Sequence, residues 1–427
     1  MQTLLALSVA MLAGLMMSRL TKIWNLPAVT AYLVAGILIG PYCLGRLGIP
    51  GIGFLTSEDV SAYSIISDAA LGFIAFSMGS EFRLSELKKT GRQATVIAIF
   101  QALVATVFVD IALCAFHLLL PDRFPLSCAI TMGAIATATA PAATLMVVKQ
   151  YKADGPLTRM LLPVVALDDV VGLIVFAVSF GIAKALEHGT VDLVSVLVNP
   201  LIEVVASLTL GALIGLLFNL TERFFFSRSK RMSISITYVF LAVALSMIEI
   251  EIGPVTLGFS SLLVCMMLGT VFCNLCDFSE ELMERMDGWT APIMVLFFVI
   301  SGSGLEFSVF RDWAIILAGV VYIAFRSLGK IEGAKVSSKF MRCTPTIQKY
   351  LGITLLPQAG VSLGMSLTAM SLGEPGKIIR NVALFAVLIY ELVGPLLTRI
   401  ALEKAGEISE KPIPPREQAK LDAQKKA

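Results

Sequence analysis

Long apolar stretches, separated by short polar segments, follow one another along almost the whole sequence. An α-helix needs about 20 apolar residues to cross the hydrocarbon core of a bilayer. This pattern predicts about thirteen transmembrane helices, which fall in the ranges 2–18, 27–42, 60–80, 94–117, 125–148, 157–184, 195–220, 233–249, 254–272, 288–304, 312–334, 350–371 and 376–401. We expect residues 1–402 to form the membrane domain and the charged segment 403–427 to be a disordered cytoplasmic tail.

Composition supports a membrane protein. Of the 427 residues, 57% are hydrophobic and 15% are charged, whereas about 25% are charged in a typical soluble protein. The net charge of +2 gives no indication of a nucleic-acid partner. We therefore expect an all-α polytopic membrane protein whose main partner is the lipid bilayer.

The loops differ strongly in positive charge, which sets the orientation of a membrane protein. The loops of one set are basic, carrying Arg19, Lys22, Arg83, Lys88, Lys89, Arg92, Lys149, Lys152, Arg159, Arg223, Arg228, Lys230, Arg231, Lys335, Lys339, Arg342 and Lys349. The alternate loops carry only Arg46, Arg123, Lys184, Arg311, Lys377 and Arg380. Basic loops stay in the cytoplasm. The expected orientation in a bacterial inner membrane has the N-terminus outside and the C-terminus in the cytoplasm.

The two halves of the chain resemble each other. The related segments are 73–82 with 298–307 and 166–172 with 388–394. The offsets are similar, and the predicted topology places Glu81 on the cytoplasmic side and Glu306 outside. We therefore expect inverted repeats at approximately 27–184 and 254–401. Inverted repeats are typical of transporters that bind their substrate near the bilayer midplane.

Two adjacent carboxylates, Asp168 and Asp169, lie deep in the predicted span 157–184. A charged aspartate at the centre of a membrane helix costs about 2.5–3.5 kcal/mol on insertion scales. Neighbouring carboxylates in a low dielectric cannot both be ionised cheaply. One of them can hold a proton near neutral pH, or release it and bind a hard cation through oxygen. Competition of a proton and a cation for one carboxylate is the minimal mechanism of an antiporter.

The two carboxylates need different partners, since successive helix residues point about 100° apart. One should face an ion cavity and the other a counter-charge. Arg326 and Lys330 are candidates on one face of the span 312–334. Two alternatives remain open: Lys330 reaches the cytoplasmic interface, or Arg326 pairs with Glu391, the repeat partner of Asp169. Three further acids, Asp68, Asp110 and Glu203, are not expected to carry transport.

Helix-breaking prolines occur in corresponding spans of the two halves, at Pro141 and Pro357. A proline inside a helix leaves a backbone carbonyl without its hydrogen bond, which a membrane tolerates only inside protein or beside a cavity. Paired interruptions indicate a transport site; a simple kink is the alternative for either proline alone. The residues around the breaks include Thr137 and Thr139 as candidate hydroxyl or carbonyl ligands, and Gln358 and Gly360 after the second proline.

Four segments together resemble the second cation:proton antiporter family, and specifically its electrogenic, two-aspartate sodium/proton exchangers of the NapA type. They are residues 26–41, residues 76–82, the Asp168–Asp169 pair, and residues 326–330, which read Arg-Ser-Leu-Gly-Lys. The first two are similar to that family's first and second core helices. The last is similar to its lysine-bearing helix.

The resemblance implies thirteen helices, a dimerisation domain, and a six-helix core with two crossed, broken helices. It also implies a homodimer and elevator-type alternating access. Asp169 would be the main ion and proton ligand, and Asp168 would pair with Lys330. The chain departs from related exchangers at Thr139-Ala140-Pro141, where they often have Thr-Asp-Pro, so the coordination and the choice of cation are left open.

The functional expectation is a transporter without a cofactor, not an enzyme. Its substrates would be protons and a monovalent cation, sodium or lithium, bound at Asp169. One alternative is a potassium/proton antiporter on the same scaffold. Another is a sodium-coupled symporter of an organic anion, which would need a larger substrate cavity.

Overall fold

The structure, a computed structural model, describes residues 2–21, 28–47, 53–54, 56, 58, 60, 62–80, 82–140, 144, 147–148, 151–187, 193–225, 227–248, 250–252, 255–276, 278–305 and 312–408. Helices dominate this part of the chain. In its first half they are α1 (Gln2–Thr21), α2 (Ala28–Ile39), α4 (Ser64–Ser80), α5 (Leu84–Leu119), α6 (Leu126–Ile135) and α8 (Pro156–Glu187). The others are α9 (Leu193–Glu222), α10 (Arg228–Ser246), α11 (Ser261–Leu275), α12 (Ser279–Ser303), α13 (Trp313–Phe340), α14 (Pro345–Thr354), α15 (Gly360–Thr368) and α16 (Glu374–Lys404).

Each of the thirteen predicted ranges overlaps at least one of these helices. Among the described residues, seven helices are long and apolar enough to span a membrane by themselves. An eighth candidate is α12, which bends by 42° between Ser279–Met286 and Gly288–Ser303. Several of the other helices are shorter and apolar, so the exact count of thirteen stays a prediction. The polytopic helical fold class is confirmed.

One predicted span starts too early. Within the predicted span 254–272, the residues of β2 (Val255–Leu257) form a strand that pairs antiparallel with β1 (Ile250–Ile252). Isoleucine, valine and threonine dominate both strands, and such β-branched residues favour extended backbone. The helix α11 begins only at Ser261. Ser260 is its N-cap, and its side chain accepts a hydrogen bond from the Leu263 amide.

The predicted tail also begins too early. Residues 403–404 complete α16, and Glu407 is buried against the start of α8. The reason is a specific turn after α16, described below, which returns the chain to the helical bundle. Residues 409–427 lie outside the described part.

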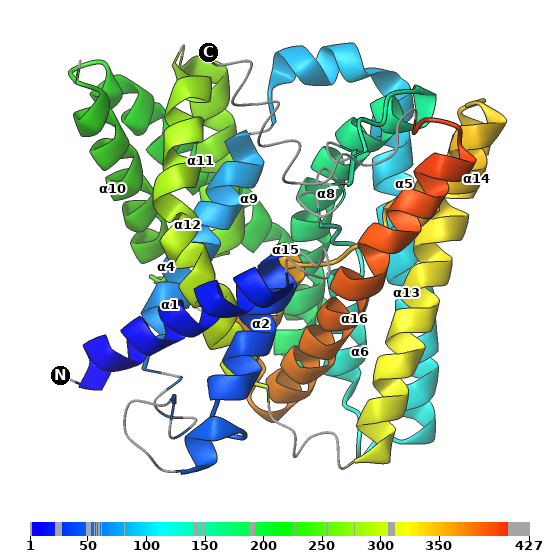
Figure 1. Cartoon of the computed structure of the whole chain (residues 1–427), viewed down its shortest axis with the longest axis horizontal. Coiled ribbons are helices and arrows are strands. Elements are labelled where there is room, and N and C mark those ends of the chain that lie inside the picture. The colour runs from blue at the N-terminus through cyan, green and yellow to red at the C-terminus, as the bar shows by residue number, and fades with distance from the viewer. Residues whose placement is uncertain are drawn as a thin grey trace.

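The helices form two groups. In one, α2 packs against α1 and α12, and α11 packs against α4 and α10. In the other, α5 packs against α6, α8 and α13, while α14 and α15 pack against α16. Figure 1 shows α10, α11 and α12 on one side of the molecule and α5, α13, α14 and α16 on the other. Helix α9 contacts α11 in the first group and α8 in the second, and so connects them.

Contacts in the first half have counterparts in the second. The pair α2 and α12 corresponds to α11 and α4, and the pair α5 and α6 corresponds to α13 and α14. Helices α5 and α13 run antiparallel, because Gly329 lies against Ala105 and Gly333 against Gln101. Two antiparallel helices can be exchanged only by a twofold axis perpendicular to them. The repeats are therefore inverted, as expected. The correspondence also includes α1, which packs against α2, and α10, which packs against α11.

Glycines set the distance between crossing helices at two equivalent places. A Cβ atom on Gly302 would lie 2.2 Å from the Leu33 carbonyl oxygen, and one on Gly36 would lie 2.0 Å from the Val299 carbonyl oxygen. In the α4–α11 crossing, a Cβ on Gly269 would lie 2.1 Å from the Phe76 carbonyl oxygen. Backbone oxygens cannot move aside as side chains do. These helices therefore cross at backbone contact, in the way that small residues allow in membranes.

We expect Gly302→Ala to destabilise the protein by about 1–3 kcal/mol, the usual cost of overpacking. The measurement is the midpoint of thermal unfolding in detergent. Gly288→Ala is the matched control in the same helix, because nothing lies within 4 Å of its added Cβ. Equal midpoints for the two variants would contradict the close-packing argument.

Candidate functional site

The site lies where two interrupted helices cross. Helix α6 ends at Ile135, and α14 ends at Thr354, so that five residues separate it from the start of α15 at Gly360. The two breaks touch: the Ala140 amide donates to the Pro357 carbonyl at 2.8 Å, and the Gln358 side-chain amide donates to the Ile135 carbonyl at 3.1 Å. The predicted break around Pro357 and the crossing of the two helices are confirmed. Pro141 lies outside the described residues.

Asp168 is the centre of a buried hydrogen-bond network. Its side chain has no exposed surface. One carboxylate oxygen accepts a hydrogen bond from the Gln101 amide of α5. The other accepts from the Thr139 hydroxyl in the first break and from the Lys330 ammonium of α13, at 2.6 Å. A buried carboxylate is stabilised only when it is paired and hydrogen-bonded in this way.

Lys330 does not reach the membrane interface. Its side chain is fully buried, and its ammonium forms the ion pair with Asp168. It also donates to the Thr137 carbonyl and, at 3.0 Å, to the Thr139 hydroxyl. The two threonines predicted as ion ligands thus meet the lysine here.

Arg326, one turn before Lys330, binds backbone carbonyls and, among the described residues, no carboxylate of the site. Its three guanidinium nitrogens donate to the backbone carbonyls of Ala136, Ala138 and Leu356, at 3.1, 2.7 and 2.9 Å. Within the described part of the chain it forms no ion pair with Glu391. Helix C-termini carry unpaired carbonyls and partial negative charge. Arg326 therefore neutralises the ends of α6 and α14, where they stop inside the protein.

Glu391 is the repeat counterpart of Asp169, as the glycines one turn later indicate. A Cβ on Gly172 of α8 would meet Thr137 in the first break, and a Cβ on Gly394 of α16 would meet Pro357 in the second. Glu391 is 1% exposed and Asp169 is 2% exposed. The structure thus buries both carboxylates on equivalent helices.

Gln101 was not among the predicted site residues. The sequence does contain a feature that points to Gln101, because an amide side chain inside the span 94–117 needs a hydrogen-bond partner in a membrane. The sequence does not say which partner. Gln358, in contrast, is among the site residues expected from the sequence. Its side-chain amide donates to the Tyr322 hydroxyl at 2.9 Å as well as to the Ile135 carbonyl.

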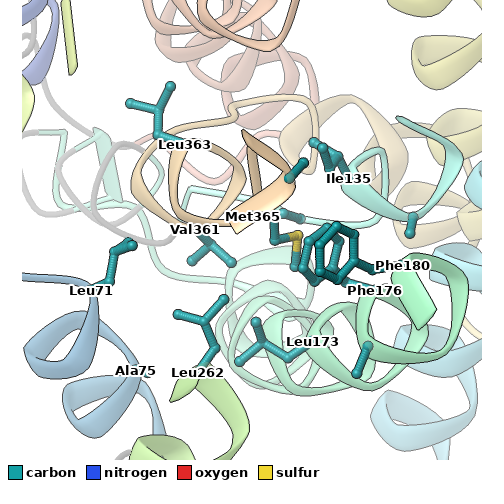
Figure 2. Close-up of a cluster of buried hydrophobic side chains, with 14 of the residues drawn as sticks. Leu71, Ala75, Ile135, Leu173, Phe176, Phe180, Leu262, Val361, Leu363 and Met365 are labelled. Carbon is teal, nitrogen blue, oxygen red and sulfur yellow. The ribbon is translucent and has the colours of Figure 1, made fainter. Parts of the chain in front are cut away.

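A cluster of apolar side chains closes one side of the site. Leu173 follows Asp169 by four residues, about 6 Å along α8, and is 1% exposed. Figure 2 shows Leu173 and Val361 of α15 facing Leu71 of α4 and Leu262 of α11. The cluster therefore lies between the two helix groups.

Buried acids and bases at two crossed helix breaks, within inverted repeats, define a membrane transporter and not a catalytic enzyme. Comparison with known proteins agrees. The family model described as "Sodium/hydrogen exchanger, transmembrane" matches residues 7–404. The chain belongs to this sodium/hydrogen exchanger family. The narrower assignment to the NapA type stays a prediction.

Two curated relatives and one solved structure are similar to the chain. The high-affinity Na⁺/H⁺ antiporter NhaS3 of Synechocystis sp. is 23% identical, over 91% of this chain and 88% of the relative. Cation/H⁺ antiporter 19 of Arabidopsis thaliana is 23% identical, but the chain spans only 44% of its length. The structure of the sodium proton antiporter MjNhaP1 from Methanocaldococcus jannaschii superposes with a TM-score of 0.73 at 16% identity, covering 96% of this chain and all of the other.

Proposed function

We propose that this protein exchanges sodium or lithium ions for protons, and that cation and proton compete for Asp169. The observation that carries the proposal is a pair of adjacent buried carboxylates, Asp168 and Asp169, on a helix that packs against the first helix break. Asp168 is bound by Lys330, Gln101 and Thr139. Asp169, the next residue on the helix, leaves the helix about 100° around the axis from Asp168 and is 2% exposed. Its carboxylate is then the ion ligand, and Asp168 holds the counter-charge.

The proposed exchange moves net charge. Lys330 is buried and held by Asp168, Thr137 and Thr139. If a cation binds at Asp169, its positive charge repels the ammonium and favours loss of the lysine proton as well as the carboxyl proton. Two protons then leave for each monovalent cation that binds. The membrane potential would drive such an unequal exchange.

The proposed movement is an elevator-type displacement of one helix group against the other. The group containing α5, α6, α8, α13, α14, α15 and α16 holds all the charged residues of the site. The contacts between this group and the other include the apolar cluster of Leu71, Leu173, Leu262 and Val361. An interface without hydrogen bonds between these side chains can slide without leaving buried polar groups unpaired. The site would then open on alternate sides of the membrane.

The assembly and orientation belong to the same proposal. Helices α1 and α9 present exposed leucines, including Leu12, Leu15, Leu213 and Leu216. These faces suit lipid or a second copy of the chain, and we propose a homodimer. The basic loops support a cytoplasmic C-terminus in a bacterial inner membrane.

The test is proton release from proteoliposomes that contain the purified protein and an acidic lumen reported by a pH-sensitive dye. Adding sodium outside should raise the luminal pH, and lithium should do the same. Potassium is a separate arm, because a potassium response in place of the sodium response would favour the potassium/proton alternative. The symporter alternative predicts no response to any of the three cations without an organic anion. No luminal change with any of them would overturn the proposed function.

A further inference from the structure

The last described turn of the chain contacts the first turn of the ion-site helix. Glu407 lies three residues beyond α16 and is 5% exposed. Its carboxylate accepts hydrogen bonds from the backbone amides of Leu157 and Thr158, at 2.6 and 2.8 Å, and from the Thr158 hydroxyl at 2.8 Å. Its own carbonyl accepts from the Asp154 amide at 3.2 Å. The first amides of a helix have no partner within it, and here Glu407 supplies one.

A specific local structure brings Glu407 to this place. Helix α16 ends at Lys404, and Gly406, two residues later, has a φ of +74°. The Gly406 amide donates to the Glu403 carbonyl, and the Glu407 amide donates to the Leu402 carbonyl. This is the hydrogen-bond pattern of a Schellman motif, which needs a residue with positive φ. Leu402 and Ile408 pack with Leu157 in one apolar cluster, so the turn is fixed on both sides of Glu407.

The first turns of α8 are followed by a proline within the helix. Pro163 lies inside α8 and has no amide hydrogen, so the helix lacks one of its own hydrogen bonds just after its second turn. The segment before Pro163 is therefore joined to the rest of the helix by one backbone hydrogen bond fewer. Asp168 and Asp169 follow Pro163 by five and six residues. The direction in which α8 enters the site is then set in part by what holds its first turn.

We propose that Glu407 is a positioning residue for the ion site, acting through the N-terminus of α8 and not by contact with an ion. The inference rests on the proposed function, because it concerns the affinity of that same site. Glu407 carries negative charge to the positive end of the helix dipole and fixes two of its amides. The C-terminal turn thereby keeps Asp168 and Asp169 in register with Lys330 and the helix breaks. A displacement well below 1 Å is enough to weaken a preorganised site.

The test compares two ways of removing the contact. Glu407→Ala deletes the carboxylate. Gly155→Ala keeps the Glu407 residue but pushes its carboxylate away from the helix start, since a Cβ on Gly155 would lie 2.4 Å from the Glu407 Cδ atom. Glu403→Ala is the control, because Glu403 is an exposed carboxylate one turn earlier. Each protein is reconstituted, and exchange is measured against sodium concentration at fixed pH.

We expect both variants to raise the half-saturating sodium concentration by roughly 3- to 10-fold. This is the change in an equilibrium constant that corresponds to the free energy of a lost helix cap. The maximal rate per folded protein should change less. Hydrogen–deuterium exchange should show faster exchange of the Leu157 and Thr158 amides in both variants. Glu407→Gln, which keeps one neutral acceptor, should fall between wild type and Glu407→Ala. A contact with a purely structural role would lower the amount of folded protein and leave the sodium dependence unchanged.

The outcomes separate this inference from the proposed function. If the wild-type protein exchanges sodium for protons and Glu407→Ala keeps the wild-type sodium dependence while losing amide protection, the positioning role is wrong. Unchanged amide protection would show that Glu407 does not cap α8. If the wild type exchanges nothing, the proposed function fails, whereas the amide measurement still tests the cap. Gly155→Ala carries the test if Glu407→Ala does not fold.

Discussion

Asp169→Asn should abolish sodium-dependent proton release from proteoliposomes. Asparagine has nearly the shape of aspartic acid, but its amide neither binds a proton at neutral pH nor carries a negative charge for a cation. If cation and proton alternate on this one group, both halves of the exchange are lost together. Because the neutral side chain is cheaper to bury, the protein should fold at least as stably as the wild type.

The control is Asp68→Asn, which neutralises an acid of α4 in the other helix group. It should keep exchange close to the wild-type rate. The measurement is the initial rate of luminal alkalinisation over a range of sodium concentrations, with thermal unfolding in detergent as a check on folding. Wild-type exchange by Asp169→Asn would refute the assignment of this carboxylate.

The second large effect concerns Lys330. Lys330→Ala should lose most of the charge movement that accompanies sodium exchange and should raise the sodium requirement. It should also destabilise the protein, because Asp168 would remain as a buried charge without its cation, at a cost of about 3–5 kcal/mol. Lys330→Gln should show the same direction with a smaller stability loss, since its amide can still donate to Asp168.

A double substitution separates the electrical effect from the structural one. Lys330→Ala combined with Asp168→Asn removes both charges and should recover much of the lost stability, giving a non-additive double-mutant cycle. The charge movement should not return. Membrane-adsorbed proteoliposomes report transient currents, and thermal unfolding reports stability. Additive stability losses would mean that the pair at 2.6 Å contributes no coupling, and unchanged currents in Lys330→Ala would exclude Lys330 as a proton carrier.

The equivalence of the two repeats was visible in the sequence but was two residues out of register in one place. The matched segments 73–82 and 298–307 align their Glu-Phe endings. In the fold, the contact of Phe76 with Gly269 corresponds to the contact of Val299 with Gly36. The contacts therefore align Phe76 with Val299, whereas the sequence match aligns Phe76 with Ser301, two residues later. Short apolar segments resemble each other by composition, whereas the backbone contact is decided by where a glycine lets two helices touch.

The sequence by itself determined the class of protein, the approximate spans, the inverted halves and the residues worth suspecting. Those inferences depend on local properties: the length of an apolar run, the cost of a carboxylate in a membrane, and the loss of a helix bond at proline. Asp168, Asp169, Lys330 and Pro357 all stood out for such reasons before any contact was known.

Only the tertiary structure decided how these residues are used in the fold. The rotation of each helix about its axis depends on packing against elements more than a hundred residues away, so sequence spacing could not choose between Lys330 and Arg326 as the partner of Asp168. The fold pairs Lys330 with the carboxylate and aims Arg326 at the carbonyls of two broken helices. It also brings Gln101 to Asp168, and it brings Glu407 to Thr158 at the start of α8, 249 residues away in the sequence. Such contacts satisfy buried polar groups that are far apart in the sequence, and only their spatial arrangement shows which group satisfies which.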